Sequence, residues 1–290
     1  MSTSPRTLGV IGGSGLYELG QLRDVEEIPM MTPFGAPSDT IVAGRLGPTR
    51  LLFLPRHGRG HRYPPHRINY RANVLALKMA GAEQILSVSA VGSMREDIHP
   101  GDMVIVDQFI DRTRNRIDTF FDDDGVVAHV GFAHPIDGQL ASALSAAARS
   151  TGATVHDGGT YLCIEGPQFS TLAESQLYRS WGVSVIGMTN LPEARLAREA
   201  ELPYATLAMA TDYDCWREGH DAVTVEAVVA VMHENVAKAK EIIVELGKAV
   251  PDPSERPAAS ALAGAIITNP DSISPDVRDK LRPLIGKYIP

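Results

Sequence analysis

Short apolar runs alternate with amphipathic stretches along most of the chain. Runs such as Leu8–Ile11, Ile85–Val91 and Tyr204–Ala210 carry no charge and are bounded by glycine, proline or polar residues. This pattern is typical of strands that are buried on both faces of a sheet. The intervening stretches place apolar residues at helical spacing, as from Thr224 to Lys248. We therefore expect an α/β fold with a mixed, largely parallel central sheet flanked by helices.

The same pattern predicts the positions of the elements. The expected strands are residues 8–11, 40–43, 50–54, 85–91, 103–106, 159–164, 183–186 and 204–210. The expected helices are residues 71–80, 139–150, 171–181, 193–201 and 224–248. Residues 111–137 are polar and irregular, which is typical of a functional loop or a subunit contact. We expect one large domain over residues 1–250, followed by a proline-rich linker and a C-terminal helix and tail over residues 251–290.

Two carboxylates end the most apolar of these strands. Asp212 and Asp214 follow Tyr204–Ala210 directly. Because ligands of open parallel sheets bind at the carboxyl ends of strands, both side chains are expected at a crevice. Side chains two apart on an extended segment face the same way, so both carboxylates can reach one ligand. On its own, such a pair more often caps a helix or shapes a turn.

Two other strand ends carry groups suited to an anion. Gly12–Gly15 follows the first strand, and its glycines allow a ligand to approach the backbone, although a tight turn explains them equally well. The spacing fits neither a dinucleotide fingerprint nor a P-loop. Arg56 and His57 follow the strand that ends at Leu54, and arginine supplies a fork of donors for phosphate oxygens. A solvated basic loop is the alternative.

Three further strand ends complete the set. Ser89–Ser93 supplies hydroxyl groups and backbone N–H groups, and Met188-Thr189 follows another strand. Phe169 lies in a turn between a strand and a helix, where an aromatic ring can stack on a planar ligand or pack into the core. A phosphate site beside a site for a planar group is therefore one hypothesis for this edge of the sheet.

Composition narrows the range of functions. The formal net charge of −8 and the pI near 5.6 disfavour a nonspecific nucleic-acid binder, which needs lysine and arginine against phosphates. The sequence predicts no membrane span and no signal peptide. The two cysteines, Cys163 and Cys215, form no CxxC motif, so we expect neither a disulfide framework nor a cysteine metal site. We expect a cytoplasmic protein.

Seven motifs, taken in order, resemble one enzyme family. They are Gly12–Leu16, Pro55–Gly58, Asn69–Asn73, Ser89–Ser93, Ile164–Phe169, Met188-Thr189 with Pro192-Glu193, and Ala210–Trp216. Together the chain resembles the 5′-methylthioadenosine phosphorylases, in the trimeric branch of the purine nucleoside phosphorylases, from about Leu8 to Val250. The resemblance implies phosphate-dependent cleavage of S-methyl-5′-thioadenosine to adenine and 5-methylthioribose 1-phosphate in purine and methionine salvage, with no cofactor or metal and with phosphate as co-substrate.

The resemblance also implies roles for individual residues. Phosphate would bind to Ser14, Arg56, His57, Ser89, Ala90 and Thr189. The nucleoside would bind to Phe169, Met188, Asp212, Asp214, Val225 and His129. Asp212 and Asp214 would be catalytic, the first at N7 of the leaving base and the second at the 6-amino group. His129 resembles a position that reaches into the site of a neighbouring subunit, which implies a homotrimer.

One position departs from the family pattern. Several relatives have asparagine before Met-Thr, where this chain has Gly187, and Gly-Met-Thr also occurs in relatives that prefer 6-oxopurines. A phosphorylase acting on methylthioinosine or inosine is therefore an alternative, although Asp214 favours a 6-amino group. A water-dependent nucleosidase leaves Arg56 and His57 without a role. A non-catalytic nucleotide-binding module is supported only by the glycine-rich turn.

Overall fold

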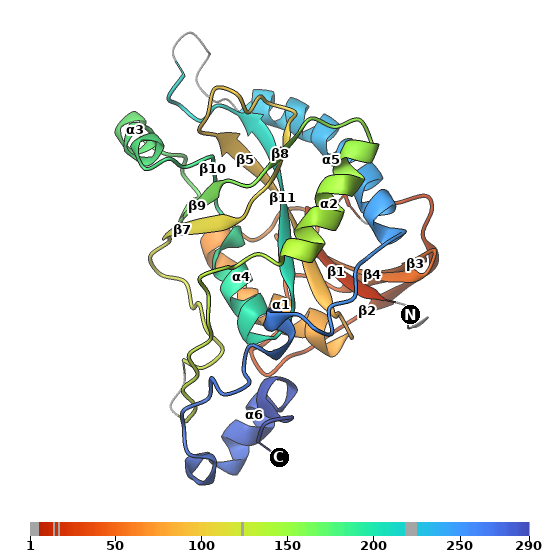
Figure 1. Ribbon diagram of the computed structural model, residues 1–290, viewed down its shortest axis with the longest axis vertical. Helices are drawn as coiled ribbons and strands as arrows, with labels where there is room; N and C mark the ends of the chain where they lie inside the picture. Colours follow the sequence, from red (N-terminus) through yellow and green to blue (C-terminus); the bar gives the residue numbers. More distant parts are fainter. Residues whose placement is uncertain (1–5, 14, 17, 123–124, 218–224, 290) are drawn as a thin grey trace.

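The strands meet in a single large sheet (Figure 1). The computed structural model describes residues 6–13, 15, 16, 18–122, 125–217 and 225–289, with the side chains of residues 225–230 outside that description. Within this part of the chain the sheet has eleven strands. They are β1 (Thr7–Gly12), β2 (Arg23–Ile28), β3 (Ile41–Leu46), β4 (Thr49–Pro55), β5 (Gln84–Ser93), β6 (Met103–Ile105), β7 (Gln108–Arg112), β8 (Val155–Asp157), β9 (Thr160–Ile164), β10 (Val185–Gly187) and β11 (Tyr204–Asp212).

Strand β5 is the hub of the sheet. The main path runs β2-β3-β4-β1-β5-β10-β9-β7, and β11 leaves it by pairing with β5 and then with β6. Strand β5 lies parallel to β1 and β11 but pairs antiparallel with β10 at its last residues, Gly92 and Ser93. Nearly every β5 side chain is buried, which explains its uncharged sequence. The carboxyl ends of β1, β4, β5 and β11 therefore lie at one edge.

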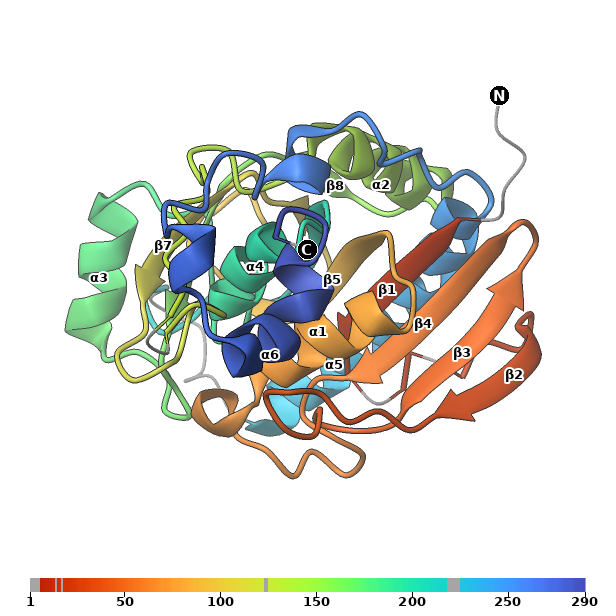
Figure 2. The ribbon, with the colours of Figure 1, turned by 90° about the horizontal axis from the view of Figure 1, so that it is seen from below.

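Two groups of helices cover the two faces of the sheet (Figure 2). The helices are α1 (Tyr70–Met79), α2 (Gly138–Ser150), α3 (Leu172–Ser180), α4 (Asn190–Glu199), α5 (Val225–Gly247) and α6 (Pro275–Ile285). Helices α1, α4 and α6 share one core cluster, whereas α2 and α5 share another on the opposite face. Helix α3 stands out beside β9 and β10. The arrangement confirms the predicted α/β fold with a mixed, largely parallel sheet.

The sequence analysis did not predict β2, β7 or β8, and each omission has a physical reason. Strand β2 is a charged, largely exposed edge strand, Arg23–Ile28, so no apolar run marks it. Strand β8 has only three residues, and β7 lies where the polar stretch 111–137 begins. Thr171 caps α3 through a capping box with Glu174.

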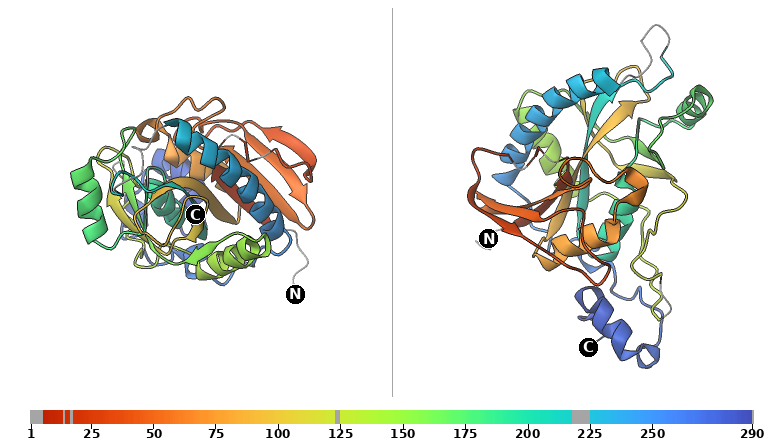
Figure 3. Two further views of the ribbon diagram at one scale, coloured as in Figure 1. Left: turned by 90° about the horizontal axis from the view of Figure 1, so that it is seen from above. Right: turned by 180° about the vertical axis from the view of Figure 1, so that it is seen from behind.

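The C-terminal segment is part of the folded body (Figure 3). Helix α6 packs against α1 near one end of the molecule, and Leu281, Leu284 and Ile285 are buried in the same core cluster as α1. The division of the chain at residue 250 stays a prediction. Among the described residues, no helix is both long and apolar enough to cross a membrane.

A buried ion pair joins this C-terminal segment to the main body. Asp137 caps the N-terminus of α2 by accepting a hydrogen bond from the Leu140 backbone N–H at 2.8 Å. The same Oδ1 atom accepts a hydrogen bond from Arg256, whose side chain is 3% exposed. Asp137 therefore has two roles, since it caps the N-terminus of α2 and neutralises the buried guanidinium group of Arg256.

Replacing Asp137 by alanine is expected to lower the free energy of unfolding by about 3–5 kcal/mol, because Arg256 would be left buried without a counter-charge and α2 would lose its cap. Denaturant titration measures this change. The control is Glu241→Ala, which removes a surface ion pair with Lys238 and should cost less than about 1 kcal/mol. Equal effects of the two substitutions would contradict this account.

Candidate active site

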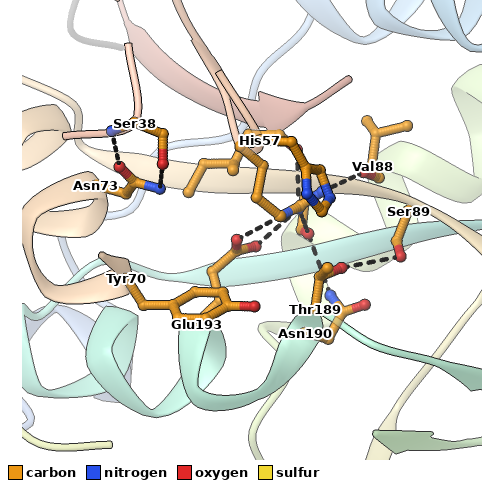
Figure 4. Close-up of polar contacts among 12 residues, drawn as sticks. Ser38, His57, Tyr70, Asn73, Val88, Ser89, Thr189, Asn190 and Glu193 are labelled. Atoms are coloured by element: carbon orange, nitrogen blue, oxygen red, sulfur yellow. Dashed lines mark hydrogen bonds and ion pairs between the residues drawn. The ribbon is translucent and has the colours of Figure 1, made fainter. Parts of the chain in front are cut away.

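Hydroxyl groups from two segments meet beyond the middle of β5 (Figure 4). Ser89 belongs to β5, and Thr189 immediately precedes α4; their side-chain oxygens are 3.2 Å apart. Thr189 occupies the N-cap position of α4, yet its side chain makes no capping hydrogen bond. Both hydroxyls are buried, and Thr189 is turned toward Ser89 rather than toward its own helix. The structure thus brings together two of the predicted phosphate-binding residues.

Arg56 is buried beside this part of β5. It follows β4, its backbone N–H donates to the Gly12 carbonyl of β1, and its side chain is 3% exposed. The guanidinium group faces Glu193 of α4, with Nε to Oε2 at 2.8 Å and Nη2 to Oε1 at 3.1 Å. The remaining donors of Arg56 reach the carbonyls of Val88 and Ile11 and the Ser87 hydroxyl. Glu193 and Val88, two of these acceptor residues, are labelled in Figure 4.

These contacts limit what Arg56 can offer a ligand. A guanidinium group has five N–H donors, and only one hydrogen of Nη1 lacks an acceptor among the contacts with the described residues. Burial opposes the charge, but the adjacent Glu193 carboxylate outweighs it, so the pKa of Arg56 lies above its ordinary value. Arg56 therefore stays charged and rigid, with most of its hydrogen bonds spent on the protein. No sequence pattern marks Glu193 as its partner.

His57 has a defined tautomer. Its Nδ1 lies 2.8 Å from the Tyr63 carbonyl oxygen, which can only accept a hydrogen bond, so Nδ1 carries the proton. The ring stacks on His61, with centroids 4.1 Å apart. Burial lowers the pKa of His57 to about 4, against the opposing effect of the Tyr63 carbonyl. At neutral pH the ring is uncharged, and Nε2 is an acceptor that fits a ligand's hydroxyl group.

The predicted carboxylate pair lies at the end of β11. Asp212 Oδ2 accepts from the Thr211 hydroxyl at 2.7 Å, and Oδ1 accepts from the Asp214 backbone N–H at 2.8 Å. Asp214 has a φ of 53°, so the strand has ended and the expected extended alternation does not continue to this residue. A tight turn, rather than the pleat, brings the carboxylates together. A Cβ at Gly92 would lie 3.0 Å from Asp212 Oδ1 and 3.4 Å from Asp214 Cβ.

Both carboxyl groups are harder to ionise than a free aspartate. Burial raises the pKa of Asp212, and the nearby Asp214 carboxylate adds to the effect. Burial likewise raises the pKa of Asp214. The Thr211 hydroxyl has one hydrogen but two acceptors in reach, Asp212 Oδ2 and the Val91 carbonyl at 3.2 Å. The Thr211 hydroxyl and the Asp214 N–H both donate to Asp212, and these hydrogen bonds oppose the rise in its pKa.

One arginine that the sequence did not single out links the remaining segments. Arg116 donates from Nη1 to the Met188 carbonyl at 2.7 Å and from Nη2 to the Glu165 carbonyl at 2.6 Å. It thereby fixes the backbone on which Met188 and the loop of Phe169 are placed. The Phe169 side chain itself is 52% exposed. No sequence motif marks Arg116, because its partners are backbone atoms far away in the chain.

The remaining predicted site residues have different outcomes. Ala90 lies in β5, and its carbonyl is 3.3 Å from Ser89 Oγ. His129 is exposed and lies away from these groups in the same chain, since its backbone N–H donates to Ala265 of the C-terminal segment. Ser14 lies outside the described residues, as does the side chain of Val225. Among the described residues, no group of three or more histidine, cysteine, aspartate or glutamate side chains is placed to hold a metal ion.

Comparisons with known proteins place this geometry in a family. Residues 7–247 match the pattern that defines the phosphorylase superfamily. The chain is 57% identical to the S-methyl-5′-thioadenosine phosphorylase of Geobacter sulfurreducens, over 98% of this chain and 99% of the relative. It is 53% identical to the protein of the same name from Koribacter versatilis, over 97% and 96% of the two chains.

Solved structures agree with the sequence relatives. A methylthioadenosine phosphorylase from an antarctic soil metagenomic library superposes with a TM-score of 0.91 at 44% identity, covering 97% of this chain and 99% of the other. A methylthioadenosine phosphorylase from Schistosoma mansoni in complex with adenine gives a TM-score of 0.85 at 36% identity, covering 90% and 98%. By fold and by sequence along nearly its whole length, this chain belongs to the phosphorylase superfamily and, within it, to the family of the methylthioadenosine phosphorylases.

Proposed function

We propose that this chain catalyses the phosphate-dependent cleavage of S-methyl-5′-thioadenosine to adenine and 5-methylthioribose 1-phosphate. The observation that carries the proposal is the meeting of two kinds of group at neighbouring strand ends. Hydroxyls suited to an anion lie on β5 and before α4, and two carboxyl groups with raised pKa end β11, which pairs with β5. The relatives that carry the same name support the substrate.

Phosphate would bind over Ser89, Thr189 and Arg56. The two hydroxyls and the one remaining Nη1 hydrogen of Arg56 would donate to its oxygens. His57 Nε2 would accept from the hydroxyl of monoprotonated phosphate. The loss of the base builds positive charge on the ribose, which the phosphate dianion stabilises before bonding to C1′. Fixed donors hold the nucleophile in place, so little motion is needed at the moment of reaction.

The leaving base would be neutralised by Asp212. When the bond between C1′ and N9 breaks, its electron pair moves into the purine ring. Asp212 would supply a proton to N7, and burial, which raises its pKa, favours the acid form that this step needs. The products are then neutral adenine and the phosphate ester of the sugar. Asp214 would accept a hydrogen bond from the 6-amino group, which a 6-oxopurine lacks.

The assembly and location follow from the same proposal. A homotrimer would bring His129, exposed in this chain, to the site of a neighbouring subunit. A cytoplasmic location fits the two free cysteines, Cys163 and Cys215. The ribose would lie against Met188 and the base near Phe169, with Ser14 and Val225 completing the phosphate and methylthio ends. No cofactor is needed for this displacement, because phosphate is itself the nucleophile.

The proposal is tested by incubating the protein with methylthioadenosine in the presence and absence of phosphate. We expect adenine and a pentose phosphate only when phosphate is present. Methylthioinosine should react at least about 100-fold less well in kcat/KM, because the ionised carboxylate of Asp214 would face a keto oxygen. Cleavage without phosphate would identify a nucleosidase, and equal rates on the two substrates would reject the role of Asp214.

Replacing Asp212 by asparagine should lower kcat by about 100-fold or more, since general acid catalysis contributes on that scale. In the wild type, kcat should fall as pH rises above the raised pKa of Asp212, because the acid form is lost. The variant should lose this alkaline decline and keep its affinity for phosphate, measured by the rise in melting temperature that phosphate causes. An unchanged kcat would refute the assignment.

A further inference from the structure

Gly187 leaves a space that a tyrosine fills. A Cβ built on Gly187 would lie 2.0 Å from the Tyr161 hydroxyl oxygen and 2.6 Å from its Cζ. Neither distance is compatible with a side chain there, and Tyr161 is fully buried, so its ring has no room to retreat. Gly187 does not have a positive φ, so its backbone conformation suits any residue. Glycine is required at this position because of the space alone.

Strand register explains why the two residues compete. Strand β10 runs parallel to β9, with Val185 opposite Tyr161. Side chains alternate along a strand, so residue 187 would project on the same face as Val185 and Tyr161. The tyrosine ring extends along this face until its hydroxyl reaches the position of the missing side chain. Tyr161 of β9 thus places its hydroxyl group where a side chain of residue 187 in β10 would otherwise lie.

The Tyr161 hydroxyl contacts two of the predicted phosphate-binding residues, Ser89 and Thr189. It lies 3.3 Å from Ser89 Oγ and accepts from the Thr189 backbone N–H at 3.5 Å. Burial raises the pKa of Tyr161 to about 12, so the phenol keeps its proton at neutral pH. These distances are long for hydrogen bonds, as is common in unliganded sites that tighten around a substrate.

The hydrogens in this cluster have a natural order. Because the Thr189 N–H donates to the Tyr161 oxygen, the tyrosine's own proton is available for Ser89 Oγ. Ser89 then receives a hydrogen bond and keeps its single hydrogen, which has the Ala90 carbonyl as an acceptor at 3.3 Å and can turn from it to a phosphate oxygen. Chains of hydrogen bonds polarise one another, so each donation strengthens the next. The chain from Thr189 through Tyr161 to Ser89 ends in a donor suited to an anion.

We propose that Tyr161 is a positioning residue of the phosphate site, which orients the Ser89 hydroxyl toward phosphate, and that Gly187 is required to admit it. The inference rests on the proposed function, since it takes Ser89 and Thr189 as phosphate ligands. Tyr161 itself does not contact the reacting atoms. Its effect is exerted through Ser89 and Thr189.

The same geometry separates Gly187 from the choice of base. Ile186 faces the opposite side of β10, where its Cγ2 lies 3.1 Å from the Cβ position of Gly92, beside Asp212. Ile186 belongs to the small core cluster with Tyr213 and Trp216, whereas Tyr161 and Val185 belong to the main core. Residue 187 therefore faces away from the carboxylates. The Gly-Met-Thr sequence reflects the presence of Tyr161 and carries no preference for a 6-oxopurine.

The first test replaces Tyr161 by phenylalanine. Losing one hydrogen bond should raise KM for phosphate about 3- to 10-fold, while KM for methylthioadenosine and the melting temperature without phosphate stay nearly unchanged. The rise in melting temperature caused by phosphate should shrink to match. The control is Tyr178→Phe, which removes the hydroxyl of another buried tyrosine, in the small core cluster, and should leave KM for phosphate as it is.

The second test uses the competition for space. Gly187→Ala should displace the Tyr161 ring and lower both the melting temperature and the affinity for phosphate. In a Tyr161→Leu background the same change should lower the melting temperature far less, because the ring is gone. Phosphate affinity should already be reduced in Tyr161→Leu, and Gly187→Ala should add little to that loss.

The outcomes distinguish this inference from the proposed function. If the wild type does not cleave methylthioadenosine with phosphate, the proposed function fails. If the wild type does so but Tyr161→Phe leaves KM for phosphate and the phosphate-induced rise in melting temperature unchanged, only the positioning role fails. If Gly187→Ala is equally harmful with tyrosine or leucine at position 161, the requirement for glycine has another cause, and this inference is overturned.

Discussion

The buried ion pair between Arg56 and Glu193 is the constraint on which the rest of the site depends. One guanidinium group joins the ends of β1, β4 and β5 to α4 through carbonyl, hydroxyl and carboxylate acceptors. Removing one member of such a pair leaves a buried charge, which is far more costly than the pair itself is stabilising. The positions of Ser89 and Thr189 are fixed because their backbones are attached to this cluster. Asn190 reinforces it, since its side-chain amide nitrogen, with two hydrogens to donate, lies within hydrogen-bond distance of the hydroxyl groups of Ser87, Tyr204 and Thr206.

Neutralisation of Arg56 also shapes the electrostatics of the site. Because Glu193 cancels much of the positive field, a dianion bound as proposed would be held mainly by oriented hydroxyl and N–H groups. Such dipoles are already in place before the ligand arrives, so little reorganisation accompanies binding. A phosphorylated product is then not retained by a strong bare cation. The carboxyl groups of Asp212 and Asp214 lie at a neighbouring strand end, where burial raises the pKa of both.

The sequence was informative where chemistry follows strand order. The apolar runs that contain Ser89 or precede Asp212 predicted residues at one edge of the sheet, because β5 and β11 are parallel and align their carboxyl ends. Thr189 reaches Ser89 for a different reason, since β10 pairs antiparallel with β5. The sequence does not identify pairs of residues that only the packing of the fold brings together. Glu193 reads as a residue in the first turn of a helix, and Tyr161 as an apolar strand position, until the fold brings them to Arg56 and Gly187. A turn was the alternative that the sequence offered for Asp212 and Asp214, and aspartate is among the non-glycine residues that most readily adopt a positive φ, as Asp214 does.

Helix α6 has a consequence for how the chain acquires its structure during synthesis. Residues Leu281, Leu284 and Ile285 belong to the same core as Val74, Leu75 and Leu77 of α1. That apolar surface is made early and stays uncovered until the final residues have left the ribosome. The nascent chain therefore exposes the apolar face of α1 until α6 has been synthesised. Exposed apolar surface of this kind promotes aggregation or chaperone binding.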